Sequence, residues 1–145
     1  MSLTWSYSSL NLFKQCPRKY HRLRVVKDIV EPQTEAITYG NEVHKVAEMY
    51  GKKREPIPKK FDFMQPILDT LLKAEGEFLF EHKMGLKSDL TPCDFFAKDV
   101  WWRGIADVLV LRPSTQEALI VDYKTGKSAK YADSDQLKLL ALAVF

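Results

Sequence analysis

The feature that most constrains this chain is a pair of apolar segments with the pattern of a β-hairpin. Residues 105–111 and 118–124 are joined by the polar turn Arg-Pro-Ser-Thr-Gln-Glu. Read as strands, these segments carry apolar side chains on both of their faces. This is typical of strands in the middle of a sheet that is covered on both sides. A charged side chain in such a strand has to be compensated by hydrogen bonds or by a metal ion.

Charged residues interrupt the apolar pattern of the hairpin at positions that face each other across its two strands. If Leu111 pairs with Ala118 across the turn, the same register places Asp107 opposite Asp122, and Lys124 shares a face with Asp122. Opposed residues of an antiparallel pair lie about 4.5–5.5 Å apart at Cβ. Two bare carboxylates that close repel each other, and a divalent cation between them removes the conflict. Hard oxygen ligands suit Mg²⁺ or Mn²⁺, so the spacing predicts a metal site.

Helices are expected around these strands, because apolar residues elsewhere recur at helical spacing. Pro17 is expected to break the first helix and Gly51 to end the second. A strand near 79–84 precedes the hairpin. The expected helices cover about 8–22, 35–50 and 63–76, and a last one begins at Ser134. The sequence therefore predicts an α/β fold in which a central mixed β-sheet is flanked by helices, as a single domain over 1–145.

The composition is that of an ordinary globular chain, with 46% hydrophobic and 28% charged residues. No apolar run approaches the roughly 18 residues that a membrane span requires. Cys16 and Cys93 are too few and too far apart to indicate a disulfide framework or a zinc site. We expect a protein of the reducing cytoplasm, without a membrane partner.

Positive charge is concentrated at the N-terminus. Residues 1–27 contain no acid and carry +6, although the whole chain carries only +3. One interpretation is a surface that faces DNA phosphates, and the alternative is a solvated helix face. The residues that we expect to contact DNA are Lys14, Arg18, Lys19 and Arg22.

Several motifs in order along the chain resemble one known family. They are Gly104-Ile-Ala-Asp107, Val121-Asp-Tyr-Lys124-Thr-Gly and Gln136, with residues 6–20 and Gly40-Asn-Glu-Val-His44 upstream. Together they resemble the PD-(D/E)XK nuclease superfamily, and within it the RecB-like exonuclease branch. The resemblance extends over about residues 6–140 and implies a restriction-endonuclease-like core.

What this resemblance implies is cleavage of DNA phosphodiesters with Mg²⁺ or Mn²⁺. By residue match, Asp107 and Asp122 bind the metal, and the backbone carbonyl of Tyr123 completes the shell. His44 approaches from its helix as a further ligand. Glu81 corresponds, less closely, to an acidic position on the preceding strand.

The resemblance also assigns the catalytic groups around the metal. Lys124 orients or deprotonates the attacking water, or steadies the charge that develops on the phosphate, and the sequence does not separate these roles. Gln136 corresponds to a glutamine that begins the next helix, near the lysine or the DNA. The implied setting is recombination, repair or phage DNA processing in a bacterial or phage context, with a helicase or recombination protein as a partner.

The chain departs from the family pattern in two places. Leu140 stands where members commonly carry a tyrosine, and the cysteines of the iron–sulfur members are missing after Cys93, so no iron–sulfur cluster is expected. The sequence ends inside an apolar helical pattern, which indicates a minimal or C-terminally shortened version of the fold. Two alternatives to an active nuclease stay open: a catalytically inactive DNA-binding module of the same fold, and a protein-interaction subunit.

Overall fold

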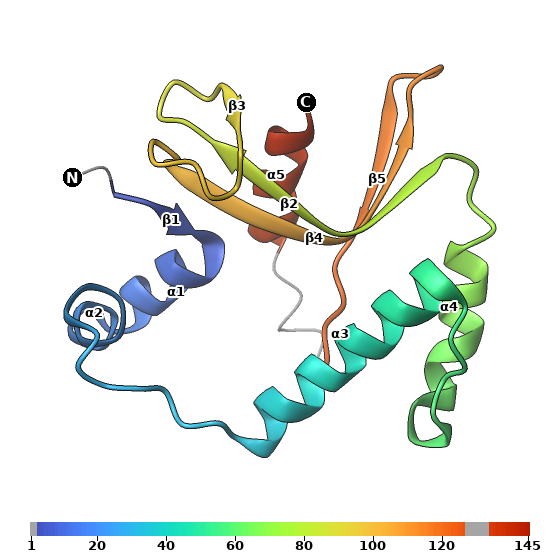
Figure 1. Ribbon diagram of the computed structural model, residues 1–145, viewed down its shortest axis with the longest axis horizontal. Coiled ribbons are helices and arrows are strands. Elements are labelled where there is room, and N and C mark those ends of the chain that lie inside the picture. Colours follow the sequence, from blue (N-terminus) through green and yellow to red (C-terminus); the bar gives the residue numbers. More distant parts are fainter. Residues whose placement is uncertain (1–2, 127–133) are drawn as a thin grey trace.

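A mixed β-sheet with helices packed around it forms the described part of the chain, residues 3–126 and 134–145 of a computed structural model (Figure 1). The strands are β1 (Trp5–Ser6), β2 (Glu77–Leu86), β3 (Pro92–Cys93), β4 (Trp102–Arg112) and β5 (Glu117–Val121). The helices are α1 (Tyr7–Gln15), α2 (Pro17–Tyr20), α3 (Glu35–Lys53), α4 (Gln65–Leu71) and α5 (Ser134–Val144), with a π-helical turn η1 (His21–Val26) and a 3-10 helix η2 (Lys59–Met64). The predicted fold class is confirmed.

Strand β4 is the centre of the sheet. It pairs with β2 in antiparallel orientation along nearly its whole length, and β3 continues the sheet beyond β2. On its other edge β4 pairs with β1 in parallel and with β5 in antiparallel orientation. Residues 106–110 of β4 are all buried, as expected for a strand covered on both faces.

The predicted hairpin register is confirmed. Leu111 pairs with Ala118, and the ladder continues to the pair Val108 and Val121. The second strand is shorter than predicted, because β5 ends at Val121, one residue before Asp122. It is also more exposed than predicted, since Leu119 retains 40% exposure, and β5 pairs with β4 alone in the described part of the chain.

The edge of β4 that carries β1 and β5 is open in its middle. β1 pairs only with Trp102 and Arg103, and β5 pairs only with residues 108–112. Among the described residues, 104–107 therefore have no strand partner on this edge. We call this opening the fork. Figure 1 shows the chain after β5 leaving the sheet here and running toward α3.

Helix α3 packs on one face of the sheet and supplies two of the five buried residues of a small apolar core. Its Val43 and Ala47 are buried against residues of η2 and α4, namely Phe61, Met64 and Leu68. Gly51, predicted to end this helix, lies inside it, and the helix ends instead at Lys53. A Cβ on Gly51 would lie 2.2 Å from the Phe80 ring, so this glycine is needed for the contact between α3 and β2.

The other helices begin close to the predicted positions, but the first helical stretch continues to Val26 instead of 22. Ser6 caps α1 through a reciprocal pair of hydrogen bonds with Ser9, and the helix breaks before Pro17 as predicted. The helix expected over 63–76 is shorter, because α4 ends at Leu71. No helix in the described ranges combines the length and apolar character that crossing a bilayer requires.

Candidate active site

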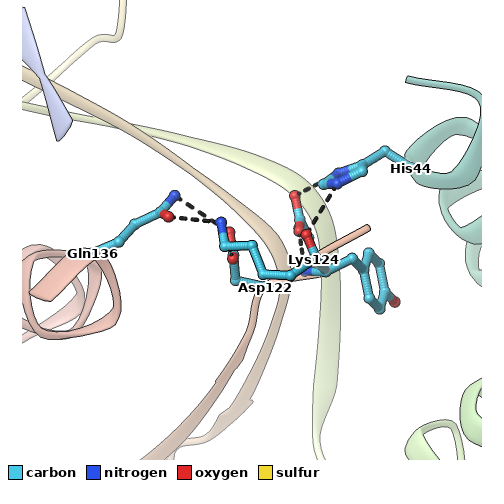
Figure 2. A network of polar contacts seen from close by, with 6 residues as sticks. His44, Asp122, Lys124 and Gln136 are labelled. Atoms are coloured by element: carbon cyan, nitrogen blue, oxygen red, sulfur yellow. Dashed lines mark hydrogen bonds and ion pairs between the residues drawn. The ribbon is translucent and has the colours of Figure 1, made fainter. Parts of the chain in front are cut away.

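The fork brings His44, which is labelled in Figure 2, into one hydrogen-bonded group with Asp107 and Tyr123. The Nδ1 atom of His44 lies 3.1 Å from Oδ1 of Asp107, and Nε2 lies 3.1 Å from the carbonyl oxygen of Tyr123. The backbone N–H of Tyr123 donates to Oδ2 of Asp107 at 2.5 Å. Just beyond the last pair of the β4–β5 ladder, the Asp107 carboxylate thus accepts the backbone N–H that a strand partner would otherwise bind.

Helix α3 can approach this segment closely because of a glycine. A Cβ on Gly40 would lie 3.3 Å from Oγ1 of Thr125, two residues after Tyr123, which is tighter than most such contacts. Gly40 precedes His44 by one helical turn on the same face. The spacing of the Gly40–His44 motif therefore sets how near the imidazole comes to the fork.

Each ring nitrogen of His44 faces an oxygen atom, so an imidazole that carries both protons can donate to Asp107 and to the carbonyl of Tyr123. The hydrogen bond with Asp107 raises the pKa of His44, although burial works in the opposite direction. A metal ligand needs a free lone pair on one ring nitrogen, so binding a cation here would release a proton.

Glu81 of β2 completes a set of groups that could hold a metal ion. One ligand atom from each of His44, Glu81 and Asp107 lies within 4.8 Å of the others. Burial, and secondarily the charge of Asp107, raises the pKa of Glu81, as expected for two carboxylates in a partly buried site. Two carboxylates and an imidazole are a donor set that suits Mn²⁺ and accepts Mg²⁺. The residues therefore fit a divalent cation.

The backbone of Glu81 is unusual. The β2–β4 ladder pairs Phe80 with Val108 and His82 with Ala106, but the intervening pair, Glu81 with Asp107, is missing. Glu81 has a φ of 49°, in the left-handed region that a glutamate rarely adopts. The interruption falls at the position of the two clustered carboxylates.

Asp122, Lys124 and Gln136 form a second group on the other side of the same chain segment (Figure 2). The Nζ atom of Lys124 lies 2.5 Å from Oδ2 of Asp122 and donates to Oε1 of Gln136 at 2.8 Å. The side-chain amide of Gln136, at the start of α5, donates to Oδ1 of Asp122 at 3.3 Å. The three side chains thus contact one another in a closed triangle.

The two aspartates of the predicted metal pair have different partners in the structure. Asp107 contacts His44 and Tyr123, whereas Asp122 contacts Lys124 and Gln136. Asp122 is not in the ligand set of the described residues, and Glu81 is. Because β5 ends at Val121, no strand ladder fixes Asp122, and its carboxylate turns toward the lysine. Its role as a ligand stays a prediction.

The N-terminal basic residues lie on α1, α2 and η1, where acids that follow in sequence pair with some of them. Lys19 forms an ion pair with Glu31 and Arg22 with Asp28, both at 2.7 Å. Lys14 and Arg18 are solvent-exposed. The contact of these residues with DNA stays a prediction.

Comparison with known proteins gives one decisive match. A profile of the PD-(D/E)XK nuclease superfamily matches residues 4–79, which is more than half of the chain. The chain belongs to the PD-(D/E)XK nuclease superfamily. The match includes α1–α3 with His44 and stops before Glu81. The positions of Glu81, Asp107 and Lys124 in this PD-(D/E)XK chain therefore come from the structure and not from the match. Neither the curated proteins nor the solved structures include a significant match to the chain.

Tyr123 allows a test of how the fork is held together. Its ring packs against the core of α3 and α4, and its hydroxyl is buried without a hydrogen-bond partner among the described residues. Burial, mainly, raises the pKa of this hydroxyl. Because an unpartnered buried hydroxyl is unfavourable, we expect Tyr123→Phe to leave the free energy of unfolding unchanged or to raise it by up to about 1 kcal/mol. Urea denaturation measures this, and a clear loss of stability would contradict it.

Proposed function

We propose that this PD-(D/E)XK chain is a deoxyribonuclease of the RecB-like exonuclease branch that hydrolyses DNA phosphodiesters with Mg²⁺ or Mn²⁺. The observation that carries the proposal is that the set of His44, Glu81 and Asp107 lies beside the triangle of Asp122, Lys124 and Gln136. A cation-binding group and a positively charged donor next to each other are what hydrolysis of an anionic ester requires.

The phosphodiester is difficult to hydrolyse because it is negatively charged and its leaving group is poor. A bound cation lowers the pKa of a coordinated water and offsets the negative charge that builds up on the phosphate. His44, Asp107 and Glu81 would hold the cation, and Asp107 also fixes the Tyr123 segment through the backbone N–H of that residue. Asp122 would serve as a further ligand if its carboxylate turned from Lys124 to the cation.

Lys124 acts as a donor to the developing charge, and not as the base. Its two contacts with described residues are to acceptor oxygens, those of Asp122 and Gln136, which are the partners that an ammonium group takes. Gln136 holds the ammonium from α5, beside Asp122. A phosphate oxygen can replace either acceptor without changing the charge on Lys124.

Substrate has access to the cation set from solvent. A groove of about 550 Å³ borders His44 and Glu81, and the first half of α3 and Thr125 form its walls. The basic residues Lys14, Arg18, Lys19 and Arg22 supply nonspecific attraction for the DNA backbone. The role in recombination, repair or phage DNA processing, the helicase or recombination partner and the cytoplasmic location follow from the branch resemblance of residues 6–20 and Gly40–His44.

Cleavage of labelled DNA with and without metal tests the proposal. We expect shortening of linear DNA in Mg²⁺ or Mn²⁺, no cleavage in a chelator, and recovery when the metal is restored. Covalently closed circular DNA should remain intact, since an exonuclease needs an end. DNA binding without cleavage in either metal would instead identify an inactive DNA-binding module. Absence of DNA binding at any salt concentration would point to a protein-interaction subunit.

A further inference from the structure

Two adjacent phenylalanines and two basic residues gather at the end of the sheet away from α4. Phe95 and Phe96 follow β3, and their rings meet edge to face with centroids 5.0 Å apart. Lys83 of β2 and Arg103 of β4 flank them. We call these four residues the aromatic–basic patch. Phe96 retains 69% exposure, which is high for an aromatic side chain.

The rings are bordered by positive charge. Nζ of Lys83 lies 5.6 Å and 5.2 Å from the ring centres of Phe95 and Phe96, and the guanidinium of Arg103 lies 5.3 Å and 5.7 Å from them. These distances are those of cation–π contacts. Lys83 pairs with Ile105 and Arg103 with Gly85, so the two cations are diagonal neighbours across β2 and β4.

The cations of the patch are not neutralised within the described ranges. No acidic side chain there forms an ion pair with Lys83 or Arg103, and Nε of Arg103 is buried without a hydrogen-bond partner. The nearest acid in sequence, Asp94, accepts from the backbone N–H of Phe96 at 2.7 Å and so fixes the loop. The patch therefore offers an exposed ring beside uncompensated positive charge.

A cavity lies between the aromatic–basic patch and the triangle of Asp122, Lys124 and Gln136. Its volume is about 350 Å³, and Phe95, Arg103, Ile105 and Gln136 are among the residues that line it. Gln136 also contacts Lys124 and Asp122. A chain of nucleotides that lies along this cavity would run from Phe95 and Arg103 of the patch to Gln136, which contacts the lysine.

We propose that the aromatic–basic patch binds single-stranded DNA, which makes unpaired DNA the substrate class of the proposed nuclease, and this inference rests on that proposed function. A base stacks on Phe96, which Phe95 supports from its edge, and the neighbouring phosphates contact Lys83 and Arg103. Stacking on an aromatic side chain needs the free face of a base, which duplex DNA covers with its own neighbours. Aromatic rings interleaved with basic groups are how proteins hold single strands without regard to sequence.

Binding measured in a chelator separates this inference from catalysis, because nothing is cleaved. Fluorescence anisotropy compares a labelled oligo-dT with a duplex of the same length. We expect Phe96→Ala to weaken binding of oligo-dT about tenfold or more and binding of the duplex less than twofold. Phe96→Leu should behave like Phe96→Ala, whereas Phe96→Trp should bind as well as the unaltered protein. Phe63→Ala is the matched control, because Phe63 is exposed to 54% but lies on η2.

An abasic oligonucleotide of equal charge isolates the stacking contribution. It should bind the unaltered protein about as weakly as oligo-dT binds the Phe96→Ala protein, and Phe96→Ala should not weaken it further. Arg103→Gln should reduce the slope of log affinity against log salt by about one.

Equal losses for oligo-dT and duplex would overturn the inference, since the patch would then contact only phosphates. Tighter binding of oligo-rU than of oligo-dT would overturn the assignment to DNA. If Phe96→Ala changes neither affinity while the protein still cleaves DNA, only this inference fails. If single-strand binding follows the expected pattern and no metal supports cleavage, only the proposed function fails.

Discussion

Asp107→Asn is expected to reduce metal-dependent DNA cleavage at least about 1,000-fold, more than the 10–100-fold that losing a group behind a metal ligand usually costs. Asp107 is 7% exposed, belongs to the ligand set, and accepts hydrogen bonds from both His44 and the backbone N–H of Tyr123. Asparagine has the same shape but no charge and only one acceptor oxygen. The substitution therefore removes a ligand and leaves one donor of the fork facing an amide N–H.

The loss of activity has to be separated from a loss of stability. We expect Asp107→Asn to lower the free energy of unfolding by about 1–3 kcal/mol, the usual range for a buried hydrogen bond to a charged group. Urea denaturation gives this value, and calorimetry with Mn²⁺ gives the cation affinity of the folded protein. Asp69→Asn is a matched control, because Asp69 accepts from Tyr50 and Gln65 far from the fork. Near-normal cleavage by Asp107→Asn would remove Asp107 from the metal site.

Lys124→Met is expected to lower kcat by about 100- to 10,000-fold, the range for removal of a positioned proton donor or charged group. Lys124 lies outside the ligand set, and its polar partners among the described residues are Asp122 and Gln136. Methionine keeps the length and apolar character of the side chain and removes the ammonium. Cation affinity and folding should therefore change little while the chemical step slows.

Single-turnover cleavage at saturating metal measures how far Lys124→Met slows the chemical step. Calorimetry with Mn²⁺ measures the cation affinity of the same variant. Lys73→Met makes the same change in net charge at an exposed position after α4, and should cleave normally. An unchanged rate for Lys124→Met would reduce the lysine to a structural partner of Asp122. If the substitution instead weakens Mn²⁺ binding by as much as it slows cleavage, Lys124 acts through the metal site.

The sequence predicted the hairpin well, because a short turn fixes the register of the strands that it joins. The pair Leu111 and Ala118 was enough to place every pair as far as Val108 and Val121. It did not predict where the side chain of Asp122 points, because β5 ends one residue earlier. Beyond a strand end the alternation of side chains no longer holds, and local partners such as Lys124 decide the direction.

The central position of Glu81 could not be derived from the sequence for a related reason. Glu81 lies opposite Asp107 only through the pairing of β2 with β4, and residues 87–101 separate these strands. No tight turn sets that register, and a resemblance suggested the glutamate without placing it. The aromatic–basic patch depends on the same long-range pairing. The helix expected over 63–76 was too long, because α4 ends at Leu71 and residues 72–76 form the turn into β2, with Gly76 at φ 135°.

The left-handed backbone at Glu81 sets stability and cation binding against each other. Such a conformation costs a residue with a side chain about 1–2 kcal/mol, and glycine avoids most of that penalty. Glycine would also relieve the repulsion with Asp107, and it would remove the carboxylate. The most stable version of this protein is thus expected to be one that has lost a proposed metal ligand. Selection for thermal stability alone would favour glycine at position 81, whereas selection for metal-dependent activity would keep the glutamate.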